Sequence, residues 1–228
     1  MTATLATLLQ DCRYHIGDTS DVAPIFTDLQ LTTFINAAIR DLNNHFPRTL
    51  SATISVTAGT HAYDLEVNFI DMLKVEYPTG QAPAAFIKYR SSKLPTFWGA
   101  AGYYDIYRPQ DQDSSNPPQI IISEPIDSET ITYTYRAEHN LLTDSGDECT
   151  ILDRYVHLIP LYVRFKAWQE LSTSEGMDPD PIKLLAATQE INAERAEKAY
   201  YKALDQAKKT LSVSEIVDWK MPGNDRIY

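Results

Sequence analysis

The spacing of apolar residues changes twice along this chain, from helical to alternating and back to helical. Apolar residues recur every three to four positions up to Phe46, alternate with polar ones from about Leu50, and return to helical spacing near Asp153. Helices and strands bury different faces, because their side-chain periods are roughly 3.6 and 2 residues. The pattern therefore predicts an α+β fold, in which two N-terminal and two C-terminal helices form a bundle and a small β domain is inserted between them.

The first segment, residues 1–47, is predicted to supply the two N-terminal helices. One amphipathic stripe runs over about residues 3–16. The second helix begins in the sequence FTDLQL, where Thr27 is placed to cap the first turn and Gln30 to complete a capping box. Pro47 follows the end of its apolar stripe, and proline cannot continue a helix.

Residues 48–140 predict the inserted antiparallel β domain. Their strand candidates are rich in Thr, Val, Ile and Tyr, which suit a pleated surface. The first candidate divides into two strands at a turn near Gly59, and the stretch 79–102 has the Pro, Gly and polar content of loops. The candidates are LSATISVTAGTHAYDL, NFIDMLKVEY, the weaker DIYRP, PQIIISEP and ETITYTYRAEH.

Residues 141–211 predict the two C-terminal helices. The sequence RYVHLIPLYVRFKAWQEL is apolar on nearly all sides, which is typical of a buried helix, and Pro160 within it predicts a kink. Asp180 as N-cap and Pro181 at the first helical position predict the start of a long helix that runs to about Leu211. Alanines in its apolar stripe allow a neighbouring helix to approach closely.

The last segment, residues 212–228, predicts an extended tail. It reads SVSEIVDWKMPGNDRIY, and Pro222 with Gly223 prevents a helix from carrying its apolar residues further. We expect these residues to pack on a partner, although a tail that folds back on its own bundle or stays disordered in the monomer would also fit the sequence. The candidate docking residues are Ile216, Val217, Trp219, Met221, Ile227 and Tyr228.

Charge and composition exclude several classes of protein. A net charge of −11 argues against a tight nucleic-acid binder, because such binding needs Lys and Arg against phosphates. Residues 141–180 hold three Lys and Arg against eight Asp and Glu, whereas residues 181–211 hold six against four. The last helix is therefore expected to lie near an acidic surface, in this chain or in a neighbour. No stretch approaches the roughly 18 apolar residues of a membrane span, so we expect a protein that is made and kept in a cytoplasm or in something assembled there.

No catalytic, cofactor or metal site is predicted. Glycine-rich phosphate loops, nucleophile elbows and paired metal-ligating histidines are all absent from the sequence. Cys12 and Cys149 are expected to be small buried residues. Two acidic loops come nearest to a metal site but lack the Gly and distal Glu of a calcium loop, so we expect them to be solvated. They are DQDSSN, with Asp111, Asp113 and Asn116, and TDSGDE, with Asp144, Asp147 and Glu148.

The order of short motifs resembles the adaptor, or head-tail connector, proteins of tailed bacteriophages. In that family a helix start of the form FTD-x-x-L-x-x-x-I-N-x-A precedes G-x-x-x-Y-x-L-P-x-[DN]-F-x-x-[IM]-x-x-V, a strand pair containing Pro, and a helical C-terminal half. Glu66 departs from the family, which tends to have proline there. The matching stretches are Phe26-Thr27-Asp28, Ile35-Asn36-Ala37-Ala38, Gly59 to Leu65, Asn68 to Val75, Ile121 to Pro125, Ile131 to Tyr135 and Leu142-Thr143.

The resemblance implies a structural protein, not an enzyme, that has no cofactor. It implies a ring, usually of twelve copies, that docks under the portal protein in the neck of the virion after assembly in the host cytoplasm. Such a ring extends the DNA channel, and an acidic lining lets DNA slide without sequence-specific binding. The tail at 212–228 would then dock on the portal, and the ring would present a platform for tail or nozzle proteins.

Three other interpretations fit parts of the sequence. A tail-completion or stopper protein of the same neck would share the ring but not touch the portal. A metal-dependent hydrolase would use the acidic loops. A stand-alone binding module would use the sequence TFWGAAGYY, whose aromatic residues could instead face a neighbouring subunit or the tail. Those residues are Phe97, Trp98, Tyr103 and Tyr104.

Overall fold

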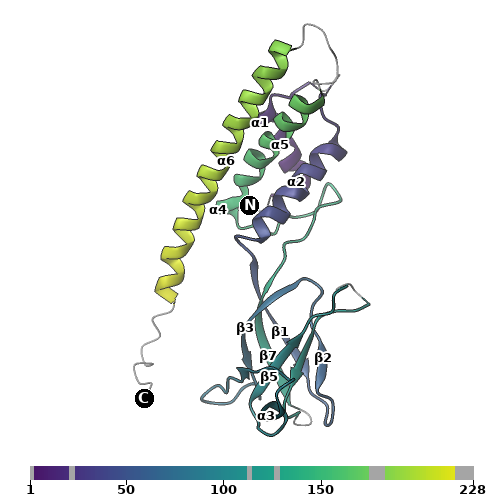
Figure 1. Ribbon diagram of the computed structural model, residues 1–228, viewed down its shortest axis with the longest axis vertical. Coiled ribbons are helices and arrows are strands. Elements are labelled where there is room, and N and C mark those ends of the chain that lie inside the picture. The colour runs from purple at the N-terminus through teal and green to yellow at the C-terminus, as the bar shows by residue number, and fades with distance from the viewer. Residues whose placement is uncertain (1–2, 21–23, 112–114, 126–128, 175–182, 219–228) are drawn as a thin grey trace. The chain divides into compact units, whose positions relative to one another are not determined.

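The chain forms two compact units, one helical and one made of β-strands (Figure 1). The computed structural model describes residues 3–20, 24–111, 115–125, 129–174 and 183–218. The helical unit combines Met1–Phe46 with His139–Tyr228, and the β unit is Pro47–Glu138. Each unit buries a hydrophobic core of its own. The predicted α+β fold, with a β section inserted into a helical bundle, is confirmed.

The two N-terminal helices are α1 (Leu5–Ile16) and α2 (Asp28–Asn43). The predicted capping box is present at the start of α2, where Thr27 Oγ1 accepts from the amide of Gln30 at 3.2 Å and Gln30 Oε1 accepts from the amide of Thr27 at 2.9 Å. Arg13, near the end of α1, pairs with both Asp18 and Asp28 at 2.7 Å. These contacts fix the turn between the two helices.

The buried C-terminal helix is divided in two, α4 (Asp153–Val156) and α5 (Leu158–Ser174). The division falls at His157, three residues before Pro160. The proline ring clashes with the carbonyl four residues earlier, which belongs to Val156, so the break lies where the proline predicts it. α5 packs against α1, α2 and α6 and forms the centre of the bundle.

The long helix α6 (Lys183–Asp218) extends past the predicted end at Leu211. Residues 212–218 are therefore helical, and the prediction that the extended tail begins at residue 212 is wrong for them. Nothing in the sequence SVSEIVD breaks a helix, and the first strong breaker is Pro222. The predicted cap of Asp180 and Pro181 lies outside the described residues, as do residues 219–228. The apolar stripe is buried as predicted at Ala193, Ala196, Tyr200, Leu204 and Ala207.

The β unit contains two sheets, with strand orders β1-β7-β3 and β2-β6-β5-β4. The turn at Gly59, whose φ is +78°, leads the chain from β1 in one sheet to β2 in the other. Every pairing is antiparallel except that of β4 with β5. The strands are β1 (Arg48–Ser55), β2 (Ala62–Asp64), β3 (Phe69–Glu76), β4 (Lys88–Tyr89), β5 (Tyr103–Tyr107), β6 (Gln119–Ile122) and β7 (Thr130–Ala137).

Two features of this unit differ from the prediction. The stretch 79–102, predicted as loop, contains β4 and a short helix, α3 (Pro95–Trp98). The pairing of β4 with β5 is parallel, whereas the predicted domain was antiparallel, because strand pairing is decided by residues far apart in sequence. The core between these strands includes Val75, Ile120, Ile131 and Tyr133.

The segment that enters the bundle from the β unit, residues 139–152, is fixed to α1 and α2 by hydrogen bonds. The side-chain amide of Asn36 donates to the carbonyl of Leu142 at 2.8 Å and accepts from its N–H at 2.9 Å. The amide of Leu5 donates to the carbonyl of Asp147 at 3.0 Å. The His139 ring lies within hydrogen-bonding distance of Thr150 Oγ1, at 2.9 Å, and of the Phe46 carbonyl, at 2.8 Å. This connector is therefore a structured part of the bundle surface.

Candidate interaction surfaces

Over the described ranges, no three His, Cys, Asp or Glu side chains lie close enough together to hold a metal ion. In the same residues no helix is long and apolar enough to cross a membrane. Exposed large apolar side chains and exposed charged ones mark the candidate interaction surfaces.

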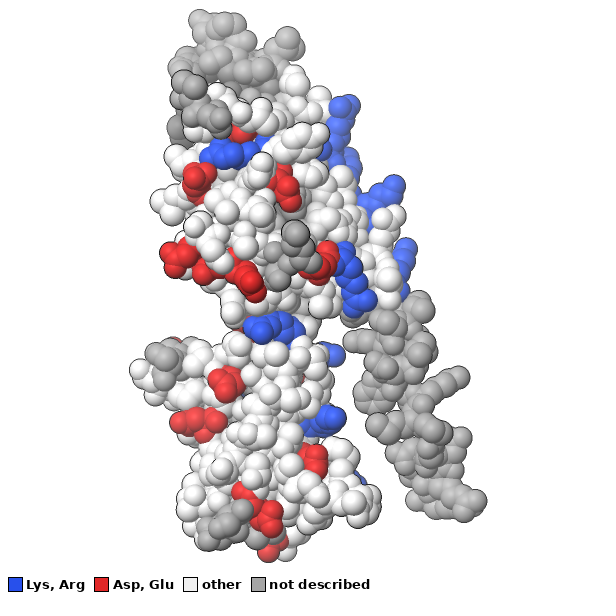
Figure 2. Space-filling model, turned by 180° about the vertical axis from the view of Figure 1, so that it is seen from behind, with Lys and Arg blue, Asp and Glu red and all other residues white. Residues whose placement is uncertain are grey.

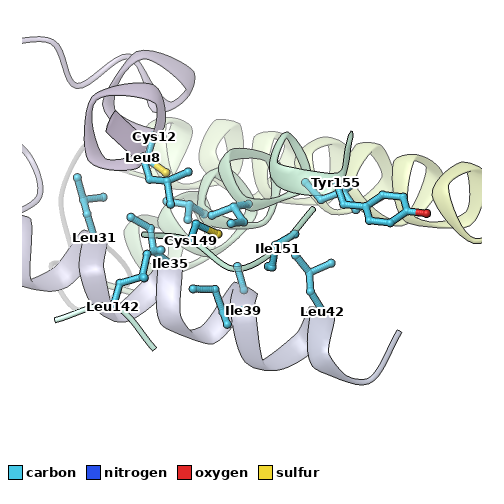
Figure 3. Packing of buried hydrophobic residues seen from close by; sticks show 14 of the residues in the cluster. Leu8, Cys12, Leu31, Ile35, Ile39, Leu42, Leu142, Cys149, Ile151 and Tyr155 are labelled. Carbon is cyan, nitrogen blue, oxygen red and sulfur yellow. The ribbon is translucent and has the colours of Figure 1, made fainter. Parts of the chain in front are cut away.

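Both cysteines lie in the bundle core (Figure 3). Figure 3 shows Cys12 beside Leu8, and Cys149 among the side chains that α2 presents to the core. Burial, with a smaller effect from Asp11, raises the pKa of the Cys12 thiol to about 12, and burial raises the pKa of Cys149 as well. Both thiols are thus protonated at neutral pH, which disfavours nucleophilic or metal-binding roles.

The acidic loop TDSGDE is a hydrogen-bonded turn. The carboxylate of Asp147 accepts from the amide of Thr143 at 2.7 Å and from that of Asp144 at 2.8 Å. These two hydrogen bonds, of which the one from Asp144 has the larger effect, hold the pKa of Asp147 below its ordinary value. Asp144 and Glu148 are exposed to solvent. In the second acidic loop Asp113 lies outside the described residues.

The four aromatic residues proposed as an interface lie in one region of the β unit but differ in exposure. Phe97 is fully buried and Tyr104 nearly so, whereas Trp98 is 52 % exposed and Tyr103 is half-buried. The Phe97 and Trp98 rings meet edge to face with centroids 4.9 Å apart, and the guanidinium of Arg90 lies 4.1 Å from the centre of the Tyr103 ring. Trp98 thus presents most of the apolar surface among the four.

The short helix α3 that carries Trp98 is anchored by a buried carboxylate. Asp105 in β5 accepts from the amide of Ser92 at 2.7 Å and from that of Ile106 at 2.8 Å. Burial alone would raise the pKa of Asp105, but hydrogen bonds from Ser92, Ile106 and Tyr89 outweigh it and lower the pKa. The Trp98 indole donates to the carbonyl of Ser92 at 2.9 Å, which orients its ring.

Sequence reasoning missed other exposed apolar residues near α3 in the chain. Phe86, Tyr89 and Leu94 are 55 %, 63 % and 50 % exposed. Their signal is visible in the sequence, since large apolar side chains recur in a stretch otherwise rich in Pro, Gly and Ser. Together with Trp98 they give residues 86–98 four exposed large apolar side chains, which is typical of a contact surface.

An apolar cavity of about 480 Å³ lies in the bundle where α1, α5 and α6 approach one another. Its lining includes Ile16, Phe26, Leu171, Trp168 and Gln189. Within the described part of the chain, the indole N–H of Trp168 and the amide oxygen of Gln189 are buried and have no hydrogen-bond partner. No local sequence pattern indicates this cavity, because its walls come from three separate helices.

The docking residues predicted for the tail lie in the last turns of α6 or after residue 218. Ile216 and Val217 belong to the helical backbone of α6, but their side chains lie outside the described residues. Trp219, Met221, Ile227 and Tyr228 lie outside them altogether. Their role stays a prediction.

Charge is distributed unevenly over the bundle. Figure 2 shows Lys and Arg gathered along α6, while Asp and Glu on that face lie mainly away from this helix. This arrangement agrees with the uneven charge of the sequence, and it places positive charge on a helix that packs mainly against α5.

Comparison with known proteins identifies one family. The family model of the SU10 adaptor protein matches residues 3–223, which is nearly the whole chain. The match includes both the helical unit and the inserted β unit. No curated protein matches the chain.

Proposed function

Because the chain belongs to the SU10 adaptor protein family, whose members are phage adaptors, we propose that it is one subunit of a ring that joins the portal vertex of a phage head to the tail. The ring docks on the portal protein, extends the DNA channel and presents a platform for tail or nozzle proteins in the virion neck. The observation that carries this proposal is the family match over residues 3–223. We expect twelve copies in the ring, because the resemblance to head-tail connector proteins implies that number.

The charge of the chain supports a role beside moving DNA. DNA-binding proteins grip phosphates with Lys and Arg, and each such contact releases counterions. A chain with a net charge of −11 offers few of these contacts. A channel built from such subunits would let DNA pass without sequence-specific binding.

In this proposal the C-terminal segment is the part that binds the portal. The apolar side chains of Ile216, Val217, Trp219 and Met221 would each contribute roughly 1.5–3 kcal/mol if buried, before the cost of ordering the segment. One segment would bind weakly. Several segments on one ring would engage together, because binding of the first raises the effective concentration of the others.

A truncation tests this role directly. The variant should end at Leu211, because that cut removes residues 212–228 and with them every proposed docking side chain. We expect the full chain to co-elute with portal rings of the same phage at a fixed ratio in sizing with light scattering, and the truncated chain to elute separately. Asn224→Ala is the matched control, since it alters the same segment without removing an apolar side chain.

The same experiment separates the two neck positions. A truncated chain that joins portal rings as well as the full chain contradicts docking by the C-terminal segment. A full chain that does not bind portal rings contradicts the adaptor position. The family match would then be explained by a tail-completion or stopper protein, which does not touch the portal.

A further inference from the structure

We propose that neighbouring copies of this chain contact each other through two different surfaces of the helical unit. One is the outer face of α6, and the other, on the next copy, is the part of the connector formed by residues 141–152. The inference rests on the ring in the proposed function and adds which surfaces form it. It is carried by the charge and the exposed apolar side chains of these two surfaces.

The outer face of α6 carries more basic than acidic side chains, with exposed Asp205 among them and exposed Glu194 beside them. Arg195, Lys198, Lys202 and Lys209 are all exposed and follow one another at intervals of three, four and seven residues, which places them on one side of the helix. That side is opposite to the buried stripe that contains Tyr200 and Leu204. The Lys198 ammonium lies 3.4 Å from the Glu194 carboxylate, but its side chain remains 77 % exposed.

This outer face also carries apolar surface. Ile191 lies one helical turn before Arg195 on the same side and is 51 % exposed, and Tyr201 at its edge is 49 % exposed. α6 packs mainly against α5, so its outer face has no large partner surface among the described residues. An exposed stripe that mixes large apolar and basic side chains is typical of a protein contact.

The connector 141–152 has the complementary character. Leu141 and Leu152 are 41 % and 57 % exposed, and Asp144 and Glu148 between them are exposed carboxylates. The segment contains no Lys or Arg. Its backbone is fixed by hydrogen bonds to Asn36 in α2 and to the start of α1, so the surface is already formed in a single copy.

The two surfaces belong to different sides of the bundle. The connector is bonded to α1 and α2, whereas α6 packs along α5, and Figure 1 shows α6 and α2 on either side of α5. The two surfaces of one copy therefore cannot cover each other. A contact between unlike surfaces leaves one of each free, so further copies can add until the assembly closes as a ring.

A second copy is the occupant that the charges favour. The outer face of α6 has an excess of basic side chains and the connector is acidic, both carry exposed large apolar side chains, and both occur on every copy. Opposite charges at the rim of such a contact speed association and fix its register, while the apolar side chains at its centre supply much of the binding energy.

Cysteine cross-linking tests the contact. Lys198→Cys and Glu148→Cys would be prepared separately, since the native Cys12 and Cys149 are buried and should not react. At high protein concentration and low salt, we expect a short bis-maleimide to link the two variants into dimers when they are mixed, but not when either is alone. The double variant should give a ladder of larger products.

The controls decide between arrangements. Lys88→Cys, on an exposed residue of the β unit, should not link to either variant. Lys198→Cys that links to itself would show α6 against α6 and would overturn the proposal. An absence of all cross-links would overturn it too, because it would mean that these surfaces do not meet.

Charge reversal gives an independent measurement. Lys198→Glu with Lys202→Glu, or Asp144→Lys with Glu148→Lys, should raise the concentration for half-association by about tenfold. Combining the two reversals should restore much of the loss, whereas a general loss of folding would not be restored. If none of these variants changes the association, the proposal is overturned.

These measurements use no portal protein, so they are separate from the test of function. Copies that cross-link as expected but ignore the portal would support the contact and contradict the proposed function. Copies that bind the portal but give no cross-linked product between α6 and the connector would support the proposed function and contradict the contact.

Discussion

Asp105 is the residue on which local order around Trp98 depends most directly. Its carboxylate joins β5 to the loop before α3 through the amide of Ser92. Since hydrogen bonds favour its charged form, the pKa lies below the ordinary value of 3.8. The charged form therefore stabilises the fold above that pH, and this contribution is lost as the pH falls through the lowered pKa.

We expect Asp105→Asn to lower the free energy of unfolding of the β unit by about 1–2 kcal/mol at neutral pH, because the asparagine amide cannot accept both bonds. The difference from the wild type should shrink as the pH falls below about 4. Urea unfolding followed by Trp98 fluorescence, in a background with Trp168→Phe and Trp219→Phe, measures both effects. Asp111→Asn is the control, since that carboxylate is exposed and makes no comparable bond to another described residue. Equal effects of the two substitutions would contradict the role of Asp105.

Single residues also show what the sequence could and could not reveal. The capping box of Thr27 and Gln30 was predictable, because both partners lie within one turn of the chain. The burial of Phe97 beside the exposed Trp98 was not, because it depends on the packing of the folded β unit around α3. Adjacent aromatic residues look alike in a sequence.

At the scale of elements, the start of α2 offers the clearest test. Thr27→Ala removes the oxygen that accepts from the amide of Gln30, and we expect it to lower the free energy of unfolding of the bundle by about 1 kcal/mol. Thr33→Ala, in the exposed middle of the same helix, should change it by less than about 0.5 kcal/mol. Thermal unfolding by circular dichroism compares the two, and an equal loss would mean that the cap contributes little.

The predicted elements were nearly all present, but their partners were not predictable. Helical and alternating periods are local signals, so α1, α2, β3 and β7 appear close to their expected positions. Whether β1 and β2 share a sheet depends on pairing with β7 and β6, which lie more than 50 residues away. The proposed contact surfaces were not predictable from local patterns either, because they depend on which charged and apolar side chains remain exposed after folding.

At the scale of the whole molecule, the two units have separate hydrophobic cores. The bundle core includes Ile39, and the core of the β unit includes Ile131, each with no exposed side-chain surface. The chain passes between the units only at Phe46 to Pro47 and at Glu138 to His139. The inserted unit can therefore gain most of its stability from its own core, as an independent domain does.

Matched core substitutions test this independence. Ile131→Ala and Ile39→Ala each create a cavity that should cost about 2–5 kcal/mol in the unit where it lies. In a Trp219→Phe background, Trp98 reports on the β unit and Trp168 on the bundle, so two variants that each keep one of these tryptophans follow the units separately. We expect Ile131→Ala to lower the urea midpoint seen by Trp98 and leave that of Trp168 unchanged, with the opposite result for Ile39→Ala. If each substitution shifts both midpoints equally, the units unfold as one, and the β unit could not keep its shape as a separate platform for the tail.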